Sequence, residues 1–202
     1  MGRKAGVTAD QTRAQILSAA RAVFARKGYD GATMAEISAE AAVSTGAIYA
    51  HFPSKAKLFA GVLEAHGRGN FERLLGLTGR QGVARFATIV GSRFDRRPVD
   101  DVALILEVIV ASSRDPELMP LVRDWLISSE ERFAGLVTQG QTEGIVDCEV
   151  PPDTVSRLAL MISLGSILTA AVEMPEPDHG QWAAVVSRIV DAFRFPAVGP
   201  SL

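Results

Sequence analysis

The stretch TMAEISAEAAVSTGAIYAHFPSKAKLF, residues 33–59, decides the fold. It opens on a capping box, in which the Thr33 hydroxyl and the Glu36 carboxylate each accept a backbone N–H at the start of a helix. Ser44 is a second helix-capping residue, and Pro53 ends the helix that Ser44 begins. The stretch therefore predicts two short helices joined by only a few residues, followed by a longer helix. That order is typical of a helix-turn-helix unit that binds DNA.

The rest of the chain is helical by the same criterion, since apolar residues recur at spacings of three and four and strict alternation is missing. We expect an all-α protein of about nine helices. A capping box of Thr8 and Gln11 opens the first helix, and Gly28 is expected to end it. The expected helices cover about 10–27, two turns after Thr33, 45–52, a connector from Lys55, 82–95, 99–112, 116–140, 153–172 and 179–194.

Charge separates the two ends of the chain, although the 202 residues together carry a net charge of only −2. Residues 1–67 hold eight lysines and arginines against five aspartates and glutamates, a net charge of +3, whereas residues 68–202 carry −5. A basic head on an acidic body indicates that only the head faces a polyanion. The prediction from this balance is a nucleic-acid partner for the N-terminal segment.

Several features favour a cytoplasmic protein without a membrane partner. The single cysteine, Cys148, excludes an internal disulfide, and no apolar leader follows Met1. The longest uncharged apolar stretch, residues 158–172, has 15 residues, whereas a membrane span needs about 20. We therefore expect no transmembrane helix.

An enzyme and a purely protein-binding helical module are the alternatives. A di-iron site needs two Glu-x-x-His pairs, but Glu176-Pro-Asp-His179 is the sole such spacing and lies in a proline-rich turn. Three histidines and one cysteine supply a zinc site poorly, and no nucleophile elbow or phosphate loop is present. We expect no catalytic residue, metal or cofactor. A protein-binding module would explain the body but not residues 33–55.

The head resembles the tetracycline-repressor (TetR) family of bacterial transcriptional regulators. The resemblance covers roughly residues 10–63 and rests on the pattern Thr33-x-x-Glu36-Ile37-x-x-x-Ala41-Ala42-Val43-Ser44-Thr45-Gly46-Ala47-Ile48-Tyr49-Ala50-His51-Phe52-x-Ser54-Lys55-x-x-Leu58-Phe59. It implies a DNA-binding domain over 1–54 and a body over 55–202 that binds an effector and dimerises. It also implies a homodimeric repressor at the bacterial nucleoid, released from a pseudo-palindromic operator by a small, mostly apolar effector.

The resemblance assigns roles within the head. It places Thr33, Tyr49, His51 and Lys55 at phosphates, and Ser44, Thr45, Gly46 and Tyr49 near base edges. Arg3 and Lys4 are expected to add minor-groove contacts from a flexible tail. The outward face of the 45–52 helix has no Arg, Lys, Asn or Gln, so we expect readout through Thr45, alanine contacts with thymine methyl groups, and DNA shape. Ala42 stands where the family often has glycine, which matters only if the turn needs a positive φ.

The body carries two further predictions. The 153–172 helix is apolar on nearly all sides and needs cover from more than one direction, which a second subunit can supply. By resemblance, the dimer interface comprises Leu160, Leu164, Ile167, Leu168, Trp182, Val186, Ile189 and Phe193. Burying an isolated polar group without a partner costs free energy, so such groups on apolar helices are paired with one another, exposed to solvent, or used to bind a ligand. Taken as a set with the family's effector-binding body, they predict an apolar pocket of His66, Phe86, Val90, Arg93, Phe94, Glu107, Trp125, Ser129, Phe133 and Met161.

Overall fold

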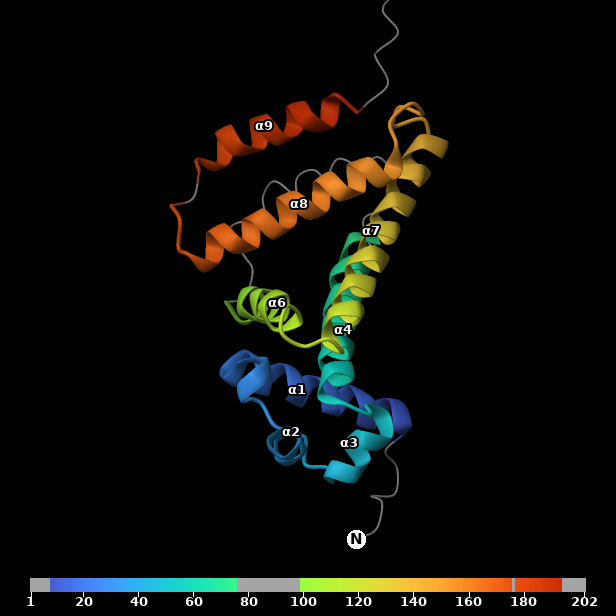
Figure 1. The fold of residues 1–202 in the computed structure, drawn as a ribbon. Coiled ribbons are helices and arrows are strands. Elements are labelled where there is room, and N and C mark those ends of the chain that lie inside the picture. Colours follow the sequence, from blue (N-terminus) through green and yellow to red (C-terminus); the bar gives the residue numbers. More distant parts are fainter. Residues whose placement is uncertain (1–7, 76–98, 176, 194–202) are drawn as a thin grey trace, which may run out of the picture. The chain divides into compact units, whose positions relative to one another are not determined.

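The computed structural model describes residues 8–75, 99–175 and 177–193. Over these ranges the chain is all-helical, which confirms the predicted fold class (Figure 1). The helix expected at 82–95 lies outside the described residues. The eight described helices are α1 (Ala9–Gly31), α2 (Met34–Glu40), α3 (Thr45–His51), α4 (Lys55–Leu75), α6 (Val99–Ser112), α7 (Leu118–Thr142), α8 (Pro152–Ala171) and α9 (His179–Asp191).

The helix starts lie where the capping residues predict them. Thr8 with Gln11 and Thr33 with Glu36 each form a complete capping box, so two backbone donors are satisfied at each start. The Ser44 side chain caps α3 by accepting the N–H of Ala47. Side-chain oxygens of two aspartates do the same at the starts of α7 and α9, namely Asp115 and Asp178.

Gly28 interrupts the first helix and does not end it, contrary to the sequence prediction. Its backbone is left-handed, with φ +71° and ψ 174°, and a last turn follows it as far as Gly31. This combination of angles is open almost exclusively to glycine. Gly28 therefore makes a kink that re-aims the end of α1, because one residue leaves the helical region and the chain then returns to it.

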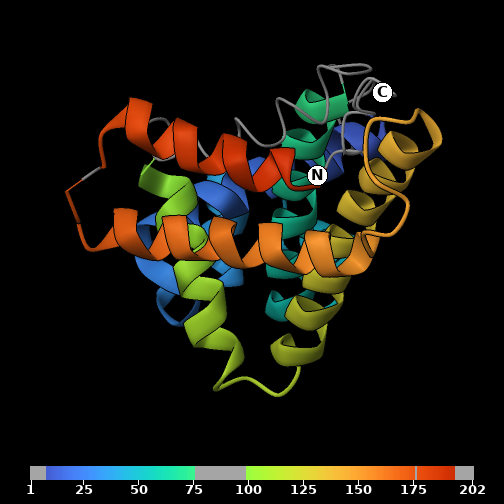
Figure 2. The same ribbon diagram turned by 90° about the horizontal axis from the view of Figure 1, so that it is seen from above.

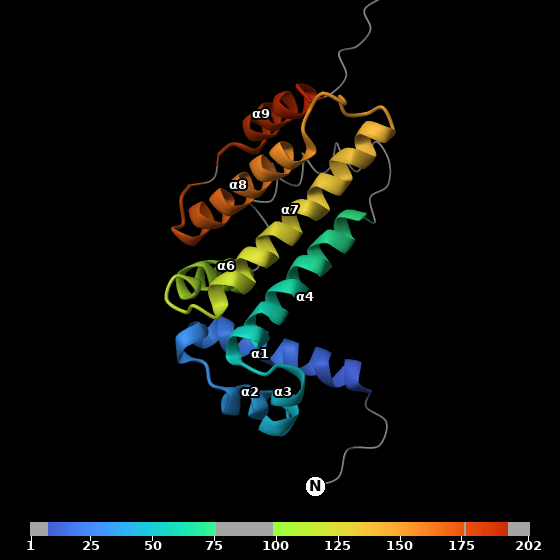
Figure 3. The same cartoon turned by 45° about the vertical axis from the view of Figure 1, so that its right-hand side comes forward.

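The chain divides into two compact units, residues 1–68 with 99–125 and residues 69–98 with 126–202. In the first unit, α1 packs against α2 and α6, and α2 packs against α3 (Figure 3). An aromatic cluster lies at the centre of its core, since the ring centroid of Phe59 lies 4.5 Å from that of Phe24 and 5.2 Å from that of Tyr29. Aliphatic side chains of the same unit are also fully buried, including Ile16, Ile37, Ile48 and Leu58.

In the second unit, α8 and α9 run alongside each other in opposite directions (Figure 2). Arg157 on α8 holds Glu130 on α7 through two hydrogen bonds of 2.7 Å. α8 has 20 residues and a mean hydropathy of 1.5, so by length and composition alone it could cross a membrane. The uncharged stretch of 15 residues counted in the sequence is shorter than this helix. One such helix is weak support for a membrane span. Only 22% of the apolar 18-residue segment of α8 is buried within the single chain, so most of its apolar surface is left open.

Candidate nucleic-acid interface

A short turn joins α2 to α3 and sets the angle between them. Ala42 in this turn has a φ of +51°, so the backbone does need the conformation that favours glycine. Two side chains hold the turn: Ser38 Oγ donates to the carbonyl of Val43 at 2.6 Å, and Gln15 Nε2 donates to the carbonyl of Ala41 at 2.8 Å. The turn is therefore fixed by hydrogen bonds from both α1 and α2, at the cost of a strained alanine.

Helix α3 has one buried face and one exposed face, as the sequence predicted. Ile48 and the capping residue Phe52 are buried in the core, and Ala47 is half-buried. The opposite face is open to solvent, and 49% of the Tyr49 side chain is exposed. The residues on this exposed or half-exposed face are Ser44, Thr45, Gly46, Tyr49, Ala50 and His51. A helix of this shape can lie in the major groove, which is about 12 Å wide.

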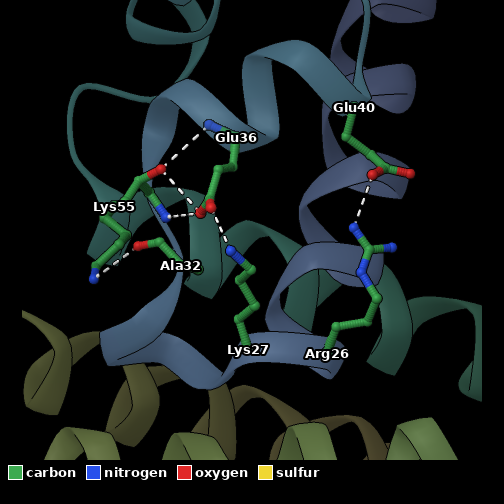
Figure 4. Close-up of polar contacts among 7 residues, drawn as sticks. Arg26, Lys27, Ala32, Glu36, Glu40 and Lys55 are labelled. Carbon is green, nitrogen blue, oxygen red and sulfur yellow. Dashed lines mark hydrogen bonds and ion pairs between the residues drawn. The ribbon is translucent and has the colours of Figure 1, made fainter.

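Ion pairs link α1 to α2 (Figure 4). Arg26 donates to Glu40 at 2.8 Å, and Lys27 donates to Glu36. The hydrogen bond from Lys27 lowers the pKa of the Glu36 carboxyl below its ordinary value. The same side chains, with Val23 and Ala39, line an open hollow of about 430 Å³. Part of the positive charge of the head is thus neutralised locally, so these two cations are poor candidates for phosphate contacts.

Lys55, predicted at a phosphate, has partners within the protein. Its Nζ donates to the carbonyl of Ala32 at 3.3 Å (Figure 4). It also donates to the carbonyl of Tyr29 at 2.7 Å and lies 4.4 Å from the centroid of the Tyr29 ring. These contacts attach the first turn of α4 to the end of α1. The phosphate contact of Lys55 remains a prediction.

Tyr29 is a residue that sequence reasoning missed. Besides accepting from Lys55, it donates its backbone N–H to Glu107 Oε1 at 2.7 Å and its hydroxyl to Asp115 Oδ2 at 2.6 Å. Burial and the bond to Asp115 raise the pKa of the Tyr29 hydroxyl, and that same bond lowers the pKa of Asp115. Ser54, the neighbour of Lys55, donates to Glu117, two residues after Asp115, at 2.6 Å. α6 and the corner between α6 and α7 therefore contact the end of α1 and the residue before α4 through three carboxylates.

The other predicted DNA contacts are placed as follows. The Thr33 and Ser44 hydroxyls cap α2 and α3, and both residues remain partly or fully exposed. His51 lies at the end of α3, with its ring 6.5 Å from that of Phe52. Arg3 and Lys4 lie outside the described residues. No group of three metal-ligating side chains occurs in the part of the chain that the structure describes.

The described residues include only part of the predicted effector pocket, which stays a prediction. Phe86, Val90, Arg93 and Phe94 lie outside them, as does the side chain of His66. Glu107 is bound to the backbone of α1, one of the alternatives that the sequence left open. Ser129 accepts from Arg132 at 2.8 Å. Trp125 and Phe133 are half-buried on α7, and Met161 on α8 is 63% exposed.

The predicted dimer residues divide by exposure. Ile167 and Val186 are buried within the chain, whereas Leu168 and Ile189 are exposed. The others, Leu160, Leu164, Trp182 and Phe193, are half-buried. Helical periodicity does not tell an inner face from an outer one when both are apolar, so it did not show which further apolar side chains are exposed. On α8, directly after it, and on α9 these side chains are Leu158, Met161, Val172 and Val185.

The geometry defines a class, the helix-turn-helix DNA-binding proteins. A family model described as "Bacterial regulatory proteins, tetR family" matches residues 16–62. The chain is 31% identical over 189 residues to the HTH-type transcriptional repressor Rv1474c of Mycobacterium tuberculosis, covering 90% of this chain and 92% of that protein. The chain therefore belongs to the TetR family of transcriptional regulators.

Solved structures agree on the fold. A TetR-family transcriptional regulator from Rhodococcus sp. superposes with a TM-score of 0.76 at 17% identity, over 92% of this chain and 100% of that one. A transcriptional regulator from Saccharomonospora viridis, solved in complex with choline, superposes with a TM-score of 0.64 at 21% identity, over 90% and 96% of the two chains.

Proposed function

We propose that this regulator is a homodimeric repressor that binds a two-fold symmetric operator and leaves it when a small molecule binds the body. The observation that carries the proposal is the exposed face of α3, held at a fixed angle by the braced turn at Ala42. We assign DNA binding to residues 1–54, with α4 as the connector, and effector binding and dimerisation to residues 55–202. The name of the mycobacterial relative supports the sign of regulation.

The dimer proposal rests on one apolar stripe along α8. Leu158, Met161 and Leu168 are each at least 40% exposed, and their spacings of three and seven residues place them on one side of the helix. Val172, the residue that follows the helix, is also exposed. Gly165 lies within this stripe with no atom near the position of a Cβ, so a neighbouring helix can approach there closely. On α9, Val185 and Ile189 extend the apolar surface. A second copy of the chain would cover what the single chain leaves open.

For the effector we propose only its class, a small molecule. The Saccharomonospora viridis protein holds choline in its structure, which supports a small-molecule ligand for this fold but not its identity here. A repressor that binds chromosomal DNA would work in the cytoplasm. An enzyme is not proposed, because the relatives are transcriptional regulators.

Selection from a random pool of duplex DNA tests the proposal. The full chain is mixed with the pool, bound duplexes are amplified and sequenced, and the preferred site is footprinted. The proposal predicts one shared sequence with two-fold symmetry and half-sites about one helical turn apart, because a two-fold dimer presents two copies of α3. A pool that stays random after repeated rounds contradicts it.

A further inference from the structure

We propose that α3 recognises thymine methyl groups at close range, with Gly46 and Ala50 forming the contact surface, and that it does not identify purines by hydrogen bonds. This inference rests on the proposed function, namely that α3 enters the major groove. It adds the chemical character of the half-site that α3 reads.

The first support is the composition of the exposed face. Residues four apart on a helix lie one above the other, so Gly46 and Ala50 form one stripe and Thr45 and Tyr49 form its neighbour. Both stripes are exposed or half-exposed. Neither contains Arg, Lys, Asn or Gln, the side chains that pair with guanine or adenine through two hydrogen bonds. The helix therefore offers DNA one nearly flat apolar strip beside two hydroxyls.

The second support is that the fold does not require glycine at position 46. A Cβ built on Gly46 would meet only Ser44 Oγ, at 3.9 Å, which is ordinary contact, and the backbone there is not left-handed. Glycine lowers helix stability relative to alanine. Position 46 thus carries a residue that weakens its own helix without relieving any contact inside the chain. Close approach of another molecule to the helix backbone accounts for that choice.

The chemistry of the major groove identifies what approaches. Each base presents hydrogen-bonding groups there, but thymine alone presents a methyl group, and alanine is a usual partner of that methyl. Ala50 can bury such a methyl, and Gly46 lets the base edges come close enough for the contact. The Thr45 and Tyr49 hydroxyls, beside the strip, can bond to neighbouring phosphates, which carry no sequence information. We therefore assign thymine to the half-site positions that face the Gly46–Ala50 stripe.

Base analogues in the selected site test this directly. Uracil differs from thymine only by the missing methyl, so each uracil under α3 should weaken binding about fourfold, the ratio that corresponds to about 0.8 kcal/mol for one buried carbon group. Replacement of guanines by 7-deazaguanine removes the N7 acceptor and should change affinity less than twofold. Equal binding of the uracil duplex, or a large loss with 7-deazaguanine, overturns the inference.

A pair of variants tests the glycine. Gly46→Ala should melt no lower than the parent protein yet bind the selected site at least tenfold more weakly, because the added methyl occupies the space that the bases need. Gly135→Ala is the matched control, since Gly135 lies on α7 and a Cβ built there likewise meets no close contact, with no described atom within 4 Å. It should leave DNA affinity unchanged. Unchanged affinity of Gly46→Ala overturns the inference.

The outcomes separate the two proposals. A shared two-fold site whose uracil form binds equally well overturns the thymine inference and leaves the regulator function standing. Absence of any shared site overturns both. A site with thymine at the α3 positions, sensitive to uracil and to Gly46→Ala, supports both.

Discussion

Glu107 on α6 accepts the backbone N–H of Tyr29 on α1 at 2.7 Å, across 78 positions of sequence. The carboxylate lies so close to the chain that a Cβ on the preceding residue, Gly28, would be 2.8 Å from Glu107 Oε1. Two constraints therefore favour glycine at position 28: its positive φ, and the Glu107 carboxylate, which leaves no space for a Cβ. The contact fixes the end of α1 against α6, and through Lys55 the start of α4 is attached to the same point.

We predict that Gly28→Ala destabilises the protein by about 1–3 kcal/mol, because alanine at this φ is strained and its methyl collides with Glu107. Urea unfolding followed by circular dichroism measures the loss. Gly31→Ala is the control, since the nearest atom to its built Cβ is Lys27 Cβ at 3.7 Å. A Gly28→Ala protein as stable as the Gly31→Ala protein would contradict this role of the kink.

In the turn before α3, the reverse substitution, alanine to glycine, should stabilise the protein. Ala42→Gly should stabilise the protein by about 0.5–1 kcal/mol, because glycine adopts the positive φ of this position without the steric penalty of a Cβ. Ala35→Gly, at an exposed position inside α2, should instead destabilise it by up to about 1 kcal/mol. Thermal melts of the two variants decide the matter, and a lower melting temperature for Ala42→Gly would show that the turn is not strained.

Stability in acid should depend on Asp115. The Tyr29 hydroxyl lowers the pKa of this carboxyl in the folded protein, so the interaction stabilises the fold above the ordinary aspartate pKa of about 3.9 and is lost as the pH falls below it. Asp115→Asn should reduce stability at pH 7 and flatten its decline below about pH 4. Tyr29→Phe removes the same hydrogen bond, so the double variant should lose less than the sum of the two. Additive losses would contradict the coupling.

The apolar stripe of α8 predicts a subunit interface. Leu168→Glu should convert the dimer to a monomer in sedimentation velocity, because an unpaired carboxylate is costly to bury between subunits. Met119→Glu, on α7, replaces an apolar side chain of similar exposure outside the stripe and should leave the dimer intact. A dimer that survives Leu168→Glu would place the interface elsewhere.

Local features of this fold were predictable from sequence, and long-range contacts were not. The caps at Thr8, Thr33 and Ser44 follow from rules that act over three residues, so these helix starts were predicted correctly. The division of α3 into buried and exposed faces follows from helical periodicity in the same way. The sequence shows alanine at position 42, where the family often has glycine, but only the structure shows that the φ of Ala42 is positive.

The missed contacts share a physical cause. The N–H of Tyr29 needs an acceptor because the kink at Gly28 removes it from the helix ladder, yet nothing in the sequence says which distant carboxylate supplies it. The bond between Tyr29 and Glu107 was therefore not predicted. The carbonyl partners of Lys55 were missed for a related reason, since they belong to the end of a different helix.

The measurement that most directly tests the central claim is a fluorescence-anisotropy titration of the full chain against its selected site, a shuffled duplex and a salt series. Tyr49→Ala, which alters the exposed face of α3, is compared with Arg123→Ala, an exposed cation on α7 beside Asp124. We predict tight, salt-sensitive binding of the selected site, at least tenfold weaker binding by Tyr49→Ala, and no change for Arg123→Ala. Equal affinity for the selected and shuffled duplexes, or an unaffected Tyr49→Ala protein, would contradict the claim that α3 reads DNA.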